Sequence, residues 1–136
     1  MNRYTYRAIT TYKPHYIYGN LIIDTNGNKY IVPERFFSPD GHHLMYYDDT
    51  DLPVFIQEDT VSQCTGLKDK HGQYIFENDE VRSPLLGLFV GTVIYDDGCF
   101  QMVLYDDDDS ITHQYPINSH NCKDIEVIDP SSYSSV

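Results

Sequence analysis

The chain alternates short apolar runs with polar turns, and this pattern predicts strands. Val, Ile, Thr, Tyr and Phe make up 49 of the 136 residues, whereas the chain has one alanine and five glutamates. The first group suits a pleated, half-buried surface, and alanine and glutamate are typical helix formers. The predicted strands are residues 4–11, 16–24, 29–32, 44–47, 54–57, 61–65, 73–76, 80–82, 87–95, 99–105, 111–115 and 124–128.

Turn-forming residues separate these strands and join several of them as hairpins. Asn26-Gly27 and Asp97-Gly98 are strong signals for tight hairpin turns. The polar segment 68–72 and the pair Asn78-Asp79 predict two further turns, because Gly, Asn and Asp tolerate the backbone angles that turns require. Here Gly66, Gly72, Asp69 and Asp79 are interpreted as turn chemistry.

From residue 80 onward the predicted order is a strand, a loop, a long bent strand, a tight turn and further strands. This order is typical of small SH3-like or Tudor-like barrels, in which a bent strand closes the sheet. We expect a mainly β fold with little helix, in which an N-terminal antiparallel sheet packs on that small barrel. The expected division is residues 1–60, residues 61–129 and a frayed tail at 130–136, with both lobes in one compact unit.

Charge narrows the range of partners. The net charge is −12, and beyond Arg82 nine acidic residues face one basic residue, Lys123. Such a surface repels nucleic-acid phosphates and anionic membranes, so we expect neither as a direct partner. Basic protein surfaces or cations are the natural partners. The simpler alternative is that the acidity only keeps a tyrosine-rich β protein in solution.

Three cysteines (Cys64, Cys99, Cys122) without a CxxC pair favour neither a zinc ribbon nor a disulfide framework, and they are interpreted as small core residues. No apolar run approaches the ~20 residues that span a bilayer, and the N-terminus lacks a signal-peptide pattern. These features predict a soluble, cytoplasmic protein in whatever cell makes it.

Residues 65–100 and several flanking segments resemble the YopX-like family, which consists of small proteins encoded by bacteriophages, prophages and related elements. The core match is TVSQCTGLKD at 60–69 followed by residues 72–81; the others are Tyr6-Arg7-Ala8, YGNLI at 18–22, YIVPE at 30–34, Gly91-Thr92-Val93 and residues 95–100. Ser62, Cys64 and Asn78 depart from the usual residues, and Ile9 and Tyr16 stand at usual Trp positions. The resemblance implies a β-rich domain and carries over no catalytic residue.

Acidic residues supply the first candidate site. A partner-binding acidic face is expected from Asp96, Asp97, Asp106, Asp107, Asp108 and Asp109. These clusters, with Asp48, Asp49 and Asp51, offer oxygen ligands for a weak cation site, but their spacing matches no EF-hand. The six histidines (His15, His42, His43, His71, His113, His120) lack metal-binding spacing, so we expect no metal, no cofactor and no catalytic residues.

Tyrosines and leucines supply two alternative surfaces. Tyrosine gives a large contact area at low entropic cost, so a ligand surface is an alternative, made by Tyr4, Tyr6, Arg7, Tyr16 and Tyr18. The apolar segment 83–90, with Leu85, Leu86 and Leu88, is interpreted as core, an oligomer interface or a partner contact.

The preferred function is therefore non-enzymatic binding of a host protein. In its sharpest version the acidic face imitates a nucleic acid and inhibits a host nuclease, as an anti-restriction or anti-CRISPR protein would. The alternatives are a nucleotide-binding sponge or sensor that uses the tyrosine-rich sheet, and a homo-oligomeric structural component.

Overall fold

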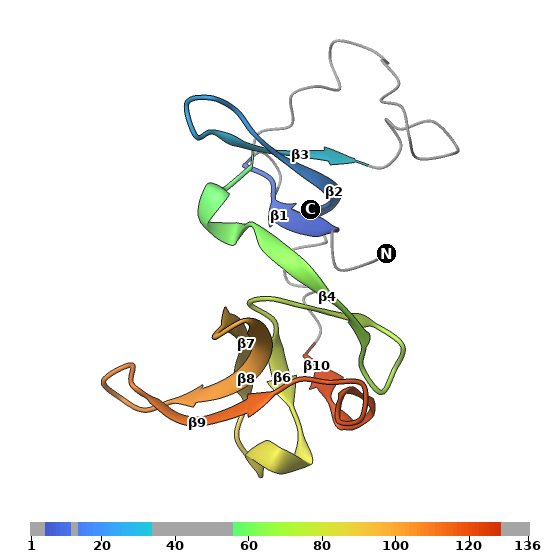
Figure 1. The fold of residues 1–136 in the computed structure, drawn as a ribbon, viewed down its shortest axis with the longest axis vertical. Coiled ribbons are helices and arrows are strands. Elements are labelled where there is room, and N and C mark those ends of the chain that lie inside the picture. The colour runs from blue at the N-terminus through green and yellow to red at the C-terminus, as the bar shows by residue number, and fades with distance from the viewer. Residues whose placement is uncertain (1–4, 12–13, 34–55, 129–136) are drawn as a thin grey trace. The chain divides into compact units, whose positions relative to one another are not determined.

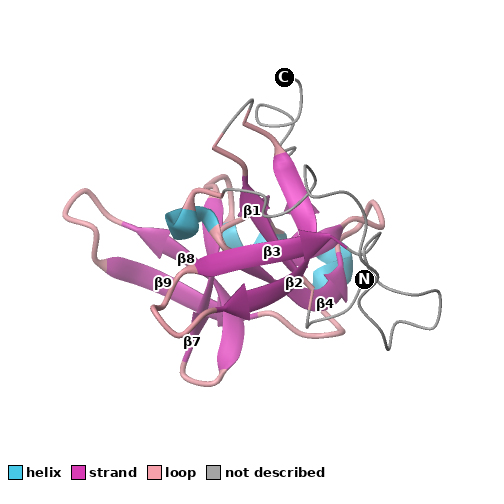
Figure 2. Ribbon diagram, turned by 90° about the horizontal axis from the view of Figure 1, so that it is seen from above, coloured by secondary structure: helices cyan, strands magenta, loops and turns pink. Residues whose placement is uncertain are grey.

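The computed structural model describes residues 5–11, 14–33 and 56–128. Strands dominate this part of the chain, and its helices are single 3-10 turns at Glu58–Thr60, Pro84–Leu86 and Cys122–Asp124 (Figure 2). The strands form two antiparallel sheets, which confirms the mainly β prediction. The described residues fall into two compact units, whose boundary in the chain lies between Ser62 and Gln63.

The N-terminal unit is built on a three-stranded meander. Strand β2 (Tyr16–Ile23) lies between β1 (Tyr6–Ile9) and β3 (Lys29–Pro33) and pairs with both of them (Figure 1). Its small core consists of Ala8, Ile31 and Ile56, with four half-buried side chains packed against it. The predicted strand 44–47 and the first half of 54–57 lie outside the described residues; Ile56 forms an isolated bridge with Thr10.

The C-terminal unit contains the sheet in the order β10-β6-β7-β8-β9 and the antiparallel strand pair β4–β5. The interior strand β8 has four successive buried residues, 100–103, and pairs along its length with both neighbours. Ten buried side chains form one core here: Ile75, Val81, Leu86, Val93, Phe100, Met102, Ile117, Cys122, Ile125 and Val127. The strand bounds are β4 Ser62–Lys68, β5 Tyr74–Phe76, β6 Glu80–Arg82, β7 Gly91–Asp96, β8 Cys99–Tyr105, β9 Ile111–Pro116 and β10 Glu126–Val127.

This sheet is open. Strands β9 and β10 are its two edges in the described part of the chain, so the strand pairing does not close a barrel. The long bent strand expected over 87–95 begins only at Gly91, because the preceding segment folds into a 3-10 turn. Pro84 starts that turn without a backbone donor, and Gly87 follows it with a φ of 64°. The SH3-like packing of this unit stays a prediction.

One loop design recurs at three places in the two units. Asp24, Asp69 and Asp106 each open a five-residue loop, and one carboxylate oxygen of each accepts the N–H groups of the residues two and four positions later, at 2.9–3.0 Å. The fourth residue of each loop has positive φ: 84° at Gly27, 81° at Gly72 and 64° at Asp109. An aspartate at the start and a residue tolerant of the left-handed region are what this turn requires.

The loop at Asp24 generates a prediction about acid stability. A hydrogen bond from the Asn28 N–H is the largest cause that lowers the pKa of Asp24 below 3.8, and Asn26 and Tyr30 add to it. A carboxyl whose pKa is lower in the folded state stabilises the fold above its unfolded pKa, and this stability is lost as the pH falls through the folded value. We therefore expect Asp24→Asn to lower the unfolding midpoint at pH 7 and to flatten its decline below pH ~4.

Thermal unfolding monitored by circular dichroism between pH 7 and 2 measures this effect. Asp59→Asn is the matched control, because it removes one carboxylate from the 3-10 turn Glu58–Thr60 and leaves the loop intact. Equal acid dependence in Asp24→Asn and the unmodified protein would contradict the role given to this loop.

Candidate functional site: acidic turns and a buried aspartate

The turn between β7 and β8 carries the first acidic pair. Asp96 and Cys99 are cross-strand partners, which leaves Asp97 and Gly98 as a two-residue loop. Their φ values are 51° and 79°, and two successive positive φ values define the type I′ turn that the Asp-Gly sequence predicts. Asp96 is tied to the sheet: its carbonyl accepts the side-chain N–H of Gln101 at 2.9 Å, and its carboxylate that of Gln114 at 3.2 Å.

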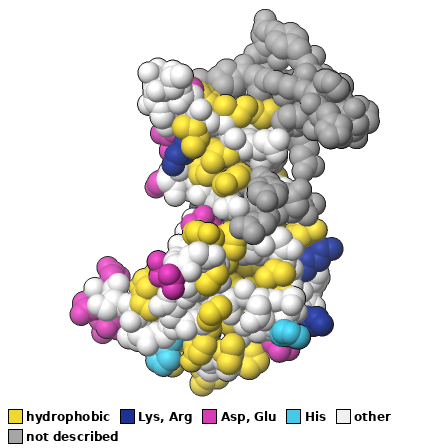
Figure 3. Space-filling view, in the orientation of Figure 1, with side chains coloured by type: hydrophobic (Ala, Val, Ile, Leu, Met, Phe, Trp, Pro, Cys, Tyr) yellow, Lys and Arg dark blue, Asp and Glu magenta, His cyan; other side chains and the backbone are white. Residues whose placement is uncertain are grey.

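The turn between β8 and β9 carries the four remaining aspartates at the end of a protruding hairpin (Figure 1; Figure 3, lower left). All four, Asp106 to Asp109, are exposed. Asp106 organises the loop, and hydrogen bonds, first with the Asp106 carboxyl and then with Ser110, lower the pKa of Asp108. The hydrogen bonds that close this loop are accepted by the carboxylates of Asp106 and Asp108, and those of Asp107 and Asp109 accept none of them.

The two acidic turns do not form one continuous cluster. They lie at opposite ends of β8, which runs from Cys99 to Tyr105. Six residue steps in an extended strand separate these ends by roughly 20 Å. The single acidic face expected from the sequence is therefore two separate negative sites. The predicted strand of seven residues between the two acidic turns was the sequence signal from which their separation could have been inferred.

The proposed tyrosine surface divides between the two faces of β1. Arg7 is 3% exposed, and its guanidinium lies 4.5 Å from the centre of the Tyr16 ring. Tyr18 is opposite Arg7 in the neighbouring strand, and its ring centre is 6.2 Å from that of Tyr16. Tyr6 instead packs against the core of the N-terminal unit. Arg7, Tyr16 and Tyr18 thus come together, Tyr6 does not join them, and Tyr4 lies outside the described residues.

The apolar segment 83–90 has one buried leucine among exposed ones. Leu86 is 3% exposed and belongs to the core, which was one of the three interpretations of this segment. Leu85 is 48% exposed, Leu88 100% and Phe89 68%. The 3-10 turn explains the split, because successive side chains in such a turn point in different directions. Phe89 is an exposed apolar residue that the sequence reasoning missed.

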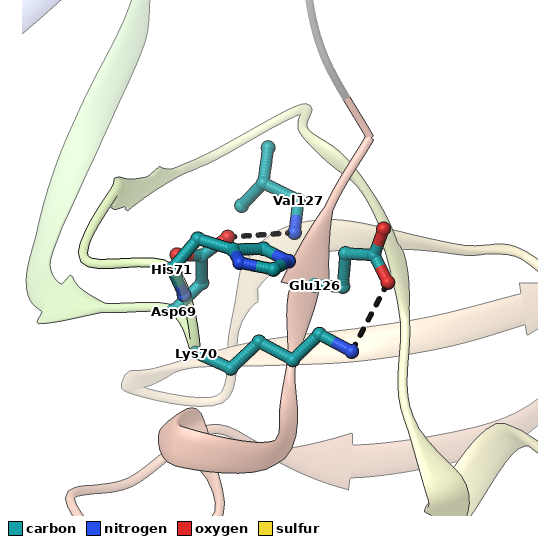
Figure 4. A network of polar contacts seen from close by, with 5 residues as sticks. All are labelled: Asp69, Lys70, His71, Glu126 and Val127. Carbon is teal, nitrogen blue, oxygen red and sulfur yellow. Dashed lines mark hydrogen bonds and ion pairs between the residues drawn. The ribbon is translucent and has the colours of Figure 1, made fainter.

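Asp69 performs a structural task in the C-terminal unit (Figure 4). Its side chain is 5% exposed, and its Oδ1 accepts the N–H groups of His71 and Gln73. Its Oδ2 accepts the N–H of Val127 at 3.0 Å, a residue 58 positions later in the chain. A buried carboxylate needs several donors to offset the loss of water, and three backbone donors supply them. This arrangement fastens strand β10 to the β4–β5 loop.

The backbone beside Asp69 strengthens the same attachment. The Lys70 N–H donates to the Ile125 carbonyl at 2.9 Å, and Lys70 Nζ pairs with Glu126 Oε2 at 3.2 Å. Asp79 has a comparable local role, because its Oδ2 accepts the buried N–H of Phe76 at 2.8 Å. Asn78 beside it has a φ of 71°, as expected for an asparagine in a turn. These contacts support the interpretation of the aspartates as turn chemistry.

The described residues contain no group of three or more His, Cys, Asp or Glu side chains placed to hold a metal ion. His42, His43 and the acidic segment 48–51 lie outside them. Cys64 and Cys122 are buried and Cys99 is half-buried, and all three are free thiols. None of the helices in this part of the chain is long and apolar enough to cross a bilayer.

A comparison with models of protein families shows to which family this chain belongs. The model of the YopX protein family matches residues 5–129, nearly the whole chain. The chain belongs to the YopX family. A comparison with curated proteins found no match. The YopX resemblance in the sequence is thereby confirmed, and its most specific part, residues 60–81, coincides with the loops that Asp69 and Asp79 organise.

Sequence reasoning missed one feature of this YopX protein, a hollow in the C-terminal unit lined by Lys70, Arg82 and Lys123. These residues lie far apart in the sequence, and strand pairing brings them together: Arg82 is the cross-strand partner of Glu126 in β10. The spacing of these residues in the sequence therefore does not predict a cationic hollow.

The attachment of β10 through Asp69 gives a direct prediction. In Asp69→Asn a side-chain N–H₂ group replaces one carboxylate oxygen. This donor then faces another donor, either the N–H of Val127 or the N–H groups of His71 and Gln73. We expect a loss of about 2–4 kcal/mol in the free energy of unfolding, because a buried charge-assisted hydrogen bond is lost and a buried donor is left unsatisfied.

Urea denaturation of Asp69→Asn and Asp106→Asn measures this loss. Asp106 opens a loop with the same local hydrogen bonds, but it is exposed and has no distant backbone partner in the described residues. A much smaller effect is expected there. Similar losses in the two variants would show that the bond to Val127 contributes little.

Proposed function

We propose that this YopX protein is a non-enzymatic binding factor that attaches to a basic surface of another protein through the tip of its β8–β9 hairpin. The observation that carries the proposal is the run of four exposed carboxylates, Asp106 to Asp109, which have no Lys or Arg partner among the described residues. Unpaired charges at a protruding tip attract an opposite surface and accelerate association with it.

Membership in the YopX family suggests a phage-type protein, and this setting favours a host protein as the partner. The sharpest version is a counter-defence inhibitor of the anti-restriction or anti-CRISPR type. The two acidic turns, roughly 20 Å apart along β8, would then take the places of two separate phosphates of one nucleic acid. A basic groove that binds DNA or RNA would accept both turns at once.

The alternative of a nucleotide-binding surface at Arg7, Tyr16 and Tyr18 is less favoured. The Arg7 guanidinium is buried against the Tyr16 ring, so its charge already has a partner within the sheet. Both rings are half-buried and lie 6.2 Å apart, a distance at which they contact each other. These groups stabilise the β1–β2 pair in the first place.

Charge-neutral variants at the hairpin tip test the proposed function. Asp107→Asn with Asp109→Asn removes two charges and keeps the loop acceptors Asp106 and Asp108, and asparagine tolerates the φ of 64° at position 109. Asp59→Asn with Glu80→Gln removes the same charge from exposed sites elsewhere. Immobilised protein is used to capture partners from lysate of the bacterial host in 50 mM and 300 mM salt, followed by mass spectrometry.

We expect the captured partner to bind the tip variant on the order of tenfold more weakly at 50 mM salt and to leave the unmodified protein at 300 mM. The control variant should retain the partner. The nucleic-acid-mimic version further requires that Asp96→Asn with Asp97→Asn weakens the same complex. Equal retention by the tip and control variants, or retention that salt does not change, would exclude the hairpin as the binding element.

A further inference from the structure

The hollow in the C-terminal unit gathers most of the basic side chains of that part of the chain. Residues 63–128 contain four Lys or Arg residues, and three of them, Lys70, Arg82 and Lys123, line a hollow of about 310 Å³. The fourth, Lys68, instead places its ammonium 5.1 Å from the centre of the Tyr74 ring. In a chain with 21 acidic residues, this concentration of positive charge is a local reversal of the overall field.

Only one of the three cations forms an ion pair within the described residues. Lys70 pairs with Glu126 at 3.2 Å, whereas Arg82 and Lys123 have no ion-pair partner among the described residues. Arg82 and Glu126 are opposite each other in β6 and β10, yet the glutamate pairs with the lysine. The hollow therefore holds two positive charges without an ion pair in the described part of the chain, and the carboxylate of Asp124 lies on the same walls.

The backbone fixes the positions of these cations. Lys70 follows Asp69 in the loop bound to Val127, and its own N–H is bonded to the Ile125 carbonyl. Lys123 lies in the 3-10 turn Cys122–Asp124, where the neighbouring Cys122 belongs to the core. Cations held on such short, anchored segments need little further ordering when an anion arrives, which favours binding.

The charge and the volume indicate the class of ligand. A phosphate monoester carries a charge of −1.5 to −2 at neutral pH, so Arg82 and Lys123 attract it more strongly than they attract a singly charged carboxylate. A volume of about 310 Å³ exceeds that of the phosphate group and is at the lower end of small-molecule sites. Asp124 and Glu126 on the same walls accept hydrogen bonds from hydroxyl groups.

We propose that this hollow binds the phosphate monoester of a hydroxyl-bearing molecule, with Arg82 and Lys123 as the principal phosphate ligands and Lys70 as a third. The site is separate from the acidic hairpin, so it adds a second, oppositely charged binding function to the same unit. The phosphate belongs either to a soluble sugar phosphate or to the headgroup of a lipid; the chemistry at the hollow is the same for both.

Titration of the isotope-labelled full chain with ribose 5-phosphate, followed by amide NMR, tests the proposal. We expect saturable shifts at the amides of Lys70, Ser83, Gly87 and Lys123, and none with ribose. Arg82→Gln and Lys123→Gln should each weaken binding about tenfold, whereas Lys68→Gln, which removes the same charge outside the hollow, should leave it unchanged. Glu126→Gln should strengthen binding, because it releases Lys70 from its ion pair.

The source of the phosphate is distinguished by a second arm with vesicles that contain phosphatidic acid. Binding to the vesicles that needs Arg82 and Lys123 identifies a lipid headgroup, and binding of ribose 5-phosphate alone identifies a soluble ligand. The site is refuted if neither probe binds at 20 mM phosphate, or if Lys68→Gln weakens binding as much as Arg82→Gln. The amide spectrum of each variant shows directly whether it is folded.

Discussion

The hydrogen bond from the Val127 N–H to the Asp69 carboxylate attaches strand β10 to the rest of the C-terminal unit. Strand β10 contributes only two residue pairs to the sheet, with Arg82 and Val81 of β6, and it is an edge strand. So short a strand gains little from pairing alone. The carboxylate supplies a charge-assisted, buried acceptor at that point, and it does so from a loop that its own local hydrogen bonds make rigid. The position of Lys70, and therefore the form of the cationic hollow, depends on the same attachment.

The loops that begin at Asp24, Asp69 and Asp106 have different roles, because the second carboxylate oxygen of each aspartate has different surroundings. At Asp24 that oxygen accepts the Tyr30 hydroxyl at 3.2 Å and completes a hairpin. At Asp69 it reaches across to β10. At Asp106 the loop stands exposed at the end of a hairpin and displays charge. The same type of turn thus supplies local stability, a long-range attachment and an exposed group of negative charges. The residues proposed to bind a partner thus lie in a turn that the fold requires.

Local pattern was sufficient to predict much of the fold, and its failures have physical reasons. Residues 80–82 and 99–105 form strands with the predicted limits, and Asp97-Gly98 forms the predicted tight turn. The strand expected from residue 87 fails because Pro84 and Gly87 impose a turn whose apolar residues look like a strand in the sequence. The separation of the acidic turns was available from the strand between them. The cationic hollow was not, because it arises from pairing between residues more than 40 positions apart.

Amide hydrogen exchange at Val127 measures how firmly the Asp69 carboxylate holds strand β10. An edge strand of two residues held only by pairing would open with every local fluctuation, whereas one held by a buried carboxylate opens only when the unit unfolds. We expect the Val127 amide to exchange as slowly as that of Met102 in the interior strand β8. Asp69→Asn should accelerate exchange at Val127 far more than at Met102. Exchange at Val127 as fast as at the exposed Leu88 in the unmodified protein would contradict this expectation.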